Sequence, residues 1–185
     1  RDIDQHESQG NNLLQHLFGA KITVLDKENR PRQKELIQAR YDQLKAEGRT
    51  PYCPRRPDTV DLDALAYAES GLEIAHQCRE LGINPSYIYL CAVDTTQAGV
   101  VLALENIASP IKVRGFSPLS NQPDRCADMA QIANQGAQRL GLDTRLEASH
   151  FDNDDTFVGV RYGIPTEAGL EALHTVARSE GILLD

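Results

Sequence analysis

The feature that most constrains the fold is the order of segments between residues 87 and 116. An apolar run rich in β-branched and aromatic residues at 87–93 is followed by three helix-capping residue types, and helical periodicity begins after them. This order predicts a buried strand, a tight turn and a helix at 97–107. A further apolar run at 111–116 predicts a second strand, so the two strands should be parallel and joined by a right-handed crossover. We therefore expect an α/β protein built on a parallel sheet.

The turn at Asp94, Thr95 and Thr96 has the residue types of an anion-binding helix start. Each of the three can cap the helix. The first main-chain N–H groups of a helix and the positive end of its dipole both favour a phosphate or a carboxylate. The same residues also suit an ordinary strand-to-helix corner in which Asp94 is only an N-cap, because capping alone explains them. By themselves, these residues favour that simpler interpretation.

Length and charge exclude several classes of protein. A chain of 185 residues with 41% hydrophobic and 25% charged residues is ordinary for a folded globular protein. The net charge of -8 and the lack of a long basic run argue against nucleic acid and anionic membrane surfaces as partners. No apolar stretch approaches the ~18 residues needed to span a bilayer, and no signal-peptide pattern opens the chain. We therefore expect a cytoplasmic location and no membrane partner.

Neither the cysteines nor the acidic residues predict a metal site. The four cysteines show no close ligand pair, so we interpret them as reduced thiols that pack as small apolar groups. The segment 150–163 has no regular period and carries Asp152, Asp154 and Asp155 close together. Because the calcium-binding loop pattern is absent, we interpret this segment as a solvated loop.

Helical and strand patterns fill the rest of the chain. Further helices are expected at residues 12–18, 33–47, 61–81, 124–140 and 165–181. Further strands are expected at residues 21–25, 50–53, 144–148 and 182–184. The expected core stripe of the helix at 61–81 is Leu62, Leu65, Ala66, Leu72, Ile74, Ala75 and Cys78. That of the helix at 124–140 is Met129, Ile132, Ala133, Ala137 and Leu140.

Several segments resemble one known family. They are QGNNLLQHLFGA at 9–20, LDALAYAESGLEIAHQ at 62–77, TTQAGVVLAL at 95–104, YGIPTEAGLEAL at 162–173 and ARSEGILLD at 177–185. They resemble the 1-aminocyclopropane-1-carboxylate (ACC) deaminases and D-cysteine desulfhydrases, which are pyridoxal-phosphate (PLP) enzymes of the tryptophan synthase β-like fold. The resemblance implies parallel-sheet, three-layer α/β lobes, incomplete here. It makes residues 1–55 the later part of the small domain and residues 56–185 the returning part of the large PLP-binding domain.

The resemblance also implies a cofactor site. In that family a turn of the type VTGSTQAG holds the cofactor phosphate through its backbone amides. The TQAG of this chain falls on the TQAG of that turn, and the preceding threonine falls on its serine. The implied cofactor-binding residues are therefore Thr95, Thr96, Gln97, Ala98 and Gly99.

A catalytic role for Tyr162 is implied in the same way. It matches a tyrosine that lies near the substrate and cofactor in the deaminases. The alternative is a tyrosine that closes its loop onto the core, because an aromatic residue before a helix start is also common packing.

The chain departs from the family pattern in two turns. Asp94 aligns with a glycine of the phosphate turn, where a carboxylate would repel the phosphate unless it is turned away as a cap. Upstream, PDTVDLDALAY at 57–67 aligns with a glycine-rich loop of the type GGSNPLGALGY. Four residues then stand at glycine positions: Pro57, Asp58, Asp63 and Ala66.

The resemblance implies a PLP-dependent deaminase or desulfhydrase that acts on a small amino acid and releases ammonia and a keto acid, with a homodimer as the expected assembly. The family's Schiff-base lysine is expected from a segment before Arg1, and none of the five lysines here stands in a matching motif. We therefore expect no turnover from this chain alone. Two alternatives are a degenerate, inactive relative that binds an anion or a partner protein, and an α/β module for a small phosphorylated ligand.

Overall fold

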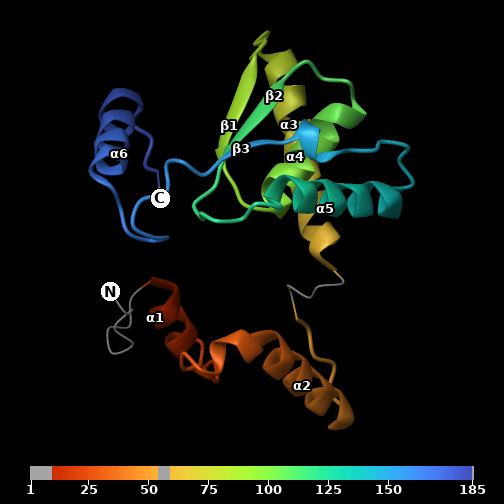
Figure 1. The fold of residues 1–185 in the computed structure, drawn as a ribbon, viewed down its shortest axis with the longest axis vertical. Helices are drawn as coiled ribbons and strands as arrows, with labels where there is room; N and C mark the ends of the chain where they lie inside the picture. The colour runs from red at the N-terminus through yellow and green to blue at the C-terminus, as the bar shows by residue number, and fades with distance from the viewer. Residues whose placement is uncertain (1–9, 54–58, 185) are drawn as a thin grey trace. The chain divides into compact units, whose positions relative to one another are not determined.

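The computed structural model describes residues 10–53 and 59–184, which fall in two compact units, Arg1–Cys53 and Pro54–Asp185. In the first unit, α1 (Gly10–Leu17) is followed by Gly19, which has a φ of 69°. A short 3-10 turn, η1 (Arg30–Arg32), leads into α2 (Gln33–Ala46) (Figure 1). Both predicted helices of this unit are confirmed, with ends shifted by at most two residues. The assignment of the units to a small and a large domain stays a prediction.

The strands expected at 21–25 and 50–53 are wrong. Both segments have extended or irregular backbone, and no strand is present among residues 10–53. The alternation of apolar residues at 21–25 is typical of a strand, but a strand also needs a neighbour that takes up its main-chain N–H and C=O groups. Val24 is correspondingly 58% exposed.

The second unit is built on a three-stranded parallel sheet in the order β1-β2-β3. Its strands are β1 (Tyr87–Cys91), β2 (Lys112–Phe116) and β3 (Asp152–Asp154). Tyr87 pairs with Lys112 in the first register and Arg114 with Asp152 in the second. The predicted parallel pair of strands is therefore confirmed, with β1 two residues shorter than expected.

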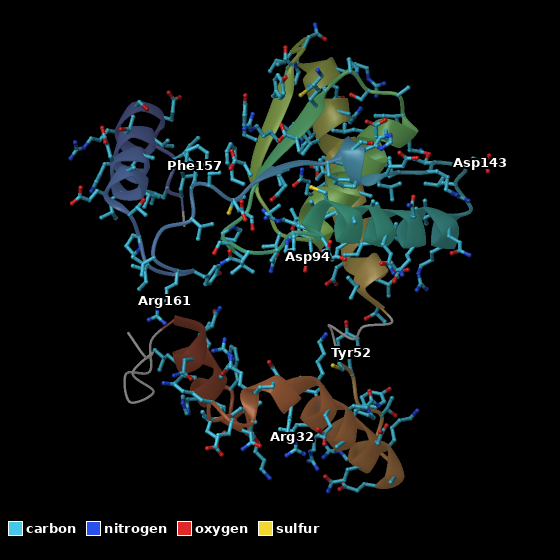
Figure 2. All side chains as sticks on the ribbon, in the orientation of Figure 1. Arg32, Tyr52, Asp94, Asp143, Phe157 and Arg161 are labelled. Atoms are coloured by element: carbon cyan, nitrogen blue, oxygen red, sulfur yellow. The ribbon has the colours of Figure 1, made fainter. Side chains whose placement is uncertain are left out.

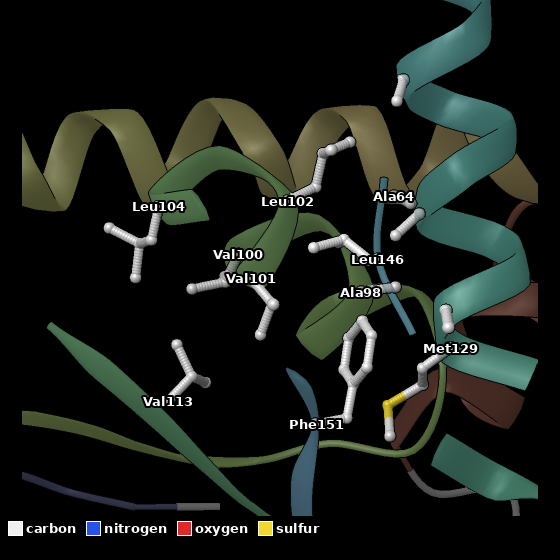
Figure 3. Close-up of a cluster of buried hydrophobic side chains, with 13 residues drawn as sticks. Ala64, Ala98, Val100, Val101, Leu102, Leu104, Val113, Met129, Leu146 and Phe151 are labelled. Carbon is white, nitrogen blue, oxygen red and sulfur yellow. The ribbon is translucent and has the colours of Figure 1, made fainter. Parts of the chain in front are cut away.

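Three helices enclose the core of this unit. They are α3 (Val60–Glu80), α4 (Thr95–Asn106) and α5 (Arg125–Leu140). Helix α4 contacts α3, α5 and β2, and every residue from Gln97 to Leu104 is buried, which explains its unbroken apolar run. The core side chains, drawn in Figure 3, include Val101, Leu102, Val113, Met129 and Phe151.

The core stripe expected for α3 is wrong in part. Leu62 is 46% exposed and Leu72 is similarly exposed, whereas Ala64, Ala68 and Gly71 are buried. The reason is the short distance between α3 and α4. A Cβ atom placed on Gly99 of α4 would lie 2.0 Å from the carbonyl oxygen of Ala64, so only small residues fit this interface.

Other differences lie toward the end of the chain. In α5, Met129, Ala133 and Ala137 are buried as expected, but Leu140 is exposed in the last turn. The segment 144–148 is not a strand and leads into η3 (Ala148–His150). The next residues form β3, inside a segment expected to be a loop. A polar strand of three residues gives no apolar alternation, so its sequence carries no strand signal.

Helix α6 (Glu167–Glu180) is confirmed as the last helix. The Thr166 hydroxyl accepts a hydrogen bond from the Gly169 N–H at 3.0 Å, and Gly181 ends the helix with a φ of 68°. The strand expected at 182–184 is not formed. None of the helices in the described ranges is long and apolar enough to cross a membrane.

Candidate functional site

The start of α4 lies just beyond the end of β1. Asp94 is the N-cap, and its Oδ1 accepts hydrogen bonds from the Thr95 main-chain N–H at 2.6 Å and from the Thr95 hydroxyl at 3.3 Å (Figure 2). The Ala98 N–H donates to the Asp94 carbonyl oxygen at 3.1 Å. The helix therefore begins at Thr95, two residues before the expected start, because the aspartate caps it directly.

The first turn of α4 presents donors suited to an anion. The N–H groups of a helix's first turn have no acceptor within the helix, and the positive end of the helix dipole lies beside them. In α4 the Thr95 N–H is taken by Asp94, and the N–H groups of Thr96 and Gln97 belong to the same turn. This end of the helix is the part of the predicted cofactor site that has the chemistry to bind an oxyanion.

Ala98 and Gly99 were also predicted to bind the cofactor, but both make contacts within the protein instead. The Ala98 N–H is bonded to the Asp94 carbonyl, and its side chain is fully buried in the core. Gly99 lies against α3, where a Cβ would be 2.0 Å from Ala64 and 2.7 Å from the Ala68 nitrogen. Gly99, the glycine of the TQAG motif, therefore allows α4 to pack closely against α3.

The Gln97 side chain holds the site turn to the sheet. It has no exposed surface, and its Nε2 donates to the Asp152 carbonyl oxygen at 2.8 Å. The Asn153 side-chain amide donates both to Gln97 Oε1 at 2.7 Å and to the Ala92 carbonyl at 3.1 Å. Gln97 is therefore a positioning residue that holds the turn to the sheet, and it offers no exposed group to a ligand.

A buried arginine that the sequence did not reveal completes this network. Arg125, at the start of α5, is 9% exposed and donates to Asn153 Oδ1 at 2.6 Å and to Asp155 Oδ2 at 2.7 Å. Its Nε is buried with no hydrogen-bond partner in the described part of the chain. The sequence signal for this contact was weak. It consisted of an arginine and a later run of acidic residues without a regular period, and many surface ion pairs have the same pattern.

The acidic segment is not the solvated loop that was expected. Asp154 accepts hydrogen bonds from the Thr156 hydroxyl and main-chain N–H, and it also pairs with Arg114 at 3.2 Å. The hydrogen bonds from Thr156, and then Arg114, lower the pKa of Asp154 from its usual value. Among residues 10–53 and 59–184, no three His, Cys, Asp or Glu side chains cluster closely enough to hold a metal ion.

A cavity of about 330 Å³ lies beside the start of α4. Its lining residues are Val93, Asp94, Gln122, Pro123, Asp124, Arg125 and Asp128. Three of these are aspartates, and the guanidinium of Arg125 is engaged by Asp155 and Asn153. Thr95, Thr96 and Gln97 are not among the lining residues, so an anion in this cavity would meet mainly carboxylates.

Tyr162 lies in the segment between β3 and α6, and it is 71% exposed. It is not part of the lining of the cavity beside α4. The ring of Tyr162 is not part of the buried hydrophobic core of the described residues. Burial therefore does not support the alternative in which this tyrosine closes its loop onto the core. Its catalytic role stays a prediction.

Comparisons with known proteins agree with the resemblance. The chain is 28% identical over 182 residues to a D-cysteine desulfhydrase of Salmonella paratyphi B, and 30% identical over 186 residues to that of Salmonella paratyphi C. Each alignment covers 98% of this chain and 54% of the relative, so the chain spans about half the length of the curated relatives it matches. The crystal structure of an ACC deaminase homologue superposes with a TM-score of 0.78 at 24% identity, over 97% of this chain and 54% of that one.

These matches confirm the predicted α/β parallel-sheet fold as that of the deaminase homologue. The family described as pyridoxal-phosphate dependent enzyme matches residues 3–185. The chain therefore belongs to the family of pyridoxal-phosphate dependent enzymes.

Proposed function

We propose that the protein is a PLP-dependent lyase that acts on a small amino acid and releases ammonia and a keto acid. The observation that carries this proposal is the family match over residues 3–185. The relatives named D-cysteine desulfhydrase, aligned over 98% of this chain, make D-cysteine the first substrate to test, with ACC as the second. The role proposed for this chain is to supply the phosphate-binding turn and the sheet behind it.

The residues at the start of α4 fit the phosphate of the cofactor. The donors that a phosphate could reach are the main-chain N–H and the hydroxyl of Thr96, which is half-buried. The Asp94 carboxylate accepts the Thr95 N–H as an N-cap does, so that donor is already used. These donors would hold the phosphate, and Asp94 acts as the cap turned onto its own helix.

When bound, PLP supplies an electron sink for the negative charge that develops at the substrate α-carbon. The residues of this chain bind and position the cofactor phosphate. The first turn of α4 orients the phosphate, and Gln97 fixes that turn to β3 through its bonds to Asp152 and Asn153. We propose Tyr162 as a catalytic group whose phenol hydroxyl donates a proton to, or accepts one from, the substrate.

The lysine required for covalent attachment of PLP is the part this chain does not provide. Its lysines are Lys21, Lys27, Lys34, Lys45 and Lys112. None of them stands in a motif that matches the family's Schiff-base lysine. The proposal therefore requires the complete natural protein to provide that lysine.

The test uses the complete natural protein that contains this sequence. It is purified, supplied with PLP and offered D-cysteine or ACC, and the release of ammonia, keto acid and, from D-cysteine, sulfide is measured. L-Cysteine serves as the matched substrate control. Keto acid release that depends on PLP supports the proposal. Absence of keto acid from both substrates, in protein shown by absorbance to hold PLP, would overturn it.

A second candidate is an inactive relative that binds an anion or a partner protein. It is favoured by Asp94, which stands where the family has a glycine, and by Asp124 and Asp128, which line the same cavity and oppose a phosphate there. A ligand that binds the folded state raises the melting temperature, so failure of PLP to raise the melting temperature would fit this candidate.

The proposal also includes assembly and location. We expect a homodimer, as the family resemblance implies, and a location in the cytoplasm. Light scattering on the complete protein measures the mass of the assembly, and a mass of one chain would contradict the dimer. Cell fractionation with a periplasmic marker tests the location.

A further inference from the structure

We propose that a cavity at the far end of α4 from Asp94 binds a free α-amino acid with an aliphatic side chain. The cavity has a volume of about 430 Å³ and is lined by residues from the last turn of α4, the first residues of β1 and β2, and η3. A helix of 12 residues places it roughly 18 Å from the candidate cofactor turn. The inference does not rest on the proposed function, because it uses none of the residues assigned to the cofactor.

Two opposite and unpaired charges line this cavity. Glu105 comes from the last turn of α4, and Lys112 is the first residue of β2. Neither side chain forms an ion pair within the described part of the chain, and the Lys112 Nζ lies 6.0 Å from the centroid of the Tyr87 ring. The other carboxylate of the lining, that of Asp152, is offset by Arg114, whose Nε lies 3.8 Å away. A ligand that carries both an ammonium and a carboxylate group can bridge the two unpaired charges.

The position of Glu105 in its helix favours a cation beside it. The helix dipole places partial negative charge at the C-terminal end of a helix, which disfavours a carboxylate there and attracts an ammonium group. Helix α4 has no basic residue in its last turn to offset this charge. The ammonium group of a ligand beside Glu105 therefore supplies the positive charge that this helix end lacks.

Further donors join Lys112 in the lining and suit the carboxylate of the ligand. The His150 Nδ1 accepts a hydrogen bond from the Glu147 main-chain N–H at 3.0 Å, so the neutral ring carries its proton on Nε2. The Ser109 hydroxyl oxygen accepts a hydrogen bond from the Ile111 main-chain N–H at 3.3 Å, which leaves the hydroxyl hydrogen to donate. Because His150 and Ser109 both line the cavity, a carboxylate there has donors besides the lysine.

Aliphatic side chains form another part of the lining. Val101, Leu104 and Val113 belong to the buried core (Figure 3), and none of the three is more than 9% exposed. An aliphatic group that packs against them removes apolar surface from water. One unpaired positive charge, one unpaired negative charge and an aliphatic surface together fit an aliphatic α-amino acid, and leucine is the probe.

The experiment measures binding to the complete natural protein by isothermal titration. The probes are leucine, isocaproate, which lacks the ammonium group of leucine, and isoamylamine, which lacks its carboxylate. The variants are Lys112→Gln and Glu105→Gln, and the control is Lys34→Gln, which changes an exposed lysine on α2. Circular dichroism without ligand verifies that each variant folds.

Leucine should bind more tightly than either analogue, because it alone can contact both charges. Lys112→Gln and Glu105→Gln should each weaken leucine binding by about threefold to tenfold, as expected for a hydrogen bond to a charged group that solvent screens. Lys34→Gln should leave leucine binding unchanged. The affinity for isocaproate should fall in Lys112→Gln only.

Three results would overturn the inference. They are no binding of leucine at millimolar concentration, equal affinity for leucine and one of the analogues, and unchanged leucine affinity in Lys112→Gln or in Glu105→Gln. Unchanged affinity would mean that leucine binds elsewhere in the protein, for example at the substrate site. Keto acid release plays no part in this test, so its outcome is independent of the proposed function.

Discussion

The side-chain amide of Asn153 donates a hydrogen bond to the buried Oε1 of Gln97 at 2.7 Å, although the two residues are 56 positions apart in the sequence. The same amide reaches the Ala92 carbonyl, which lies between β1 and the capped start of α4. The site turn is therefore held by a strand that follows it by more than 50 residues. A change that breaks these hydrogen bonds should therefore lower both the stability of the protein and its affinity for an anion.

Replacement of Gln97 by alanine should lower the free energy of unfolding by about 2–4 kcal/mol. The change leaves the Asp152 carbonyl without this donor, removes one acceptor of the Asn153 amide and opens a cavity. Urea unfolding measures the loss. Gln138→Ala, an exposed glutamine on α5, is the matched control and should change stability by less than about 0.5 kcal/mol. Similar losses in the two variants would show that the network is unimportant.

Gly99→Ala should destabilise the protein by about 3 kcal/mol or more, because the new Cβ overlaps the main chain of Ala64 at 2.0 Å and α3 and α4 must separate. Gly136→Ala on α5 is the matched control. Its Cβ would meet the side-chain ends of Leu65, at 3.1 Å, and of Leu102, at 3.5 Å, and alanine gains about 1 kcal/mol in helix propensity over glycine. Thermal unfolding of both variants tests the difference. A stable Gly99→Ala variant would contradict the close packing described here.

Arg125→Ala should cost about 3 kcal/mol, the lower end of the range for breaking a buried ion pair, since Asp155 keeps one third of its side-chain surface exposed. Arg125→Lys should recover only part of this loss, because an ammonium group cannot contact Asn153 and Asp155 in the forked geometry of guanidinium. Guanidinium chloride unfolding gives both values. The exposed Arg178→Ala variant is the control. Full recovery by lysine would show that charge alone matters at this position.

The ion pair between the buried Asp61 and the half-exposed Arg139 predicts a loss of stability in acid. The hydrogen bond from Arg139, at 2.5 Å, lowers the pKa of Asp61 in the folded state despite its burial. A carboxyl with a depressed folded pKa stabilises the fold above its unfolded pKa of about 3.9, and this contribution is lost as the pH falls through the folded value.

The measurement is the unfolding free energy between about pH 2 and pH 6, a range centred on the unfolded aspartate pKa. Asp61→Asn should flatten this acid dependence, whereas the exposed Asp143→Asn variant should leave it unchanged. An unaltered pH profile in Asp61→Asn would contradict the assigned cause.

The elements with a strong local signal were predicted well. Helix α4 and the strands on either side of it follow from an apolar run, a capping aspartate and a second apolar run, all of which act within a few residues. The helix start was misplaced by two residues because three neighbouring side chains can each cap it, and only the structure shows that Asp94 does so.

Side-chain roles within the candidate site depended on contacts that local patterns do not encode. The segment TTQAG at 95–99 suggested five cofactor-binding residues, but Gln97 bonds to β3 with its side chain, and Gly99 packs against α3. The strand β3 was missed because it is polar and its stability comes from β2, Arg125 and Gln97.

The sequence by itself determined the α/β class, the parallel strand pair, the order of the helices and the family, because these depend on periodicity, capping and motifs along the chain. The tertiary structure alone decided which faces of α3 are buried, that the acidic segment forms a strand, and that Arg125 joins the site. Those features depend on how closely helices approach and which polar groups are desolvated together, and neither quantity is a property of a single segment.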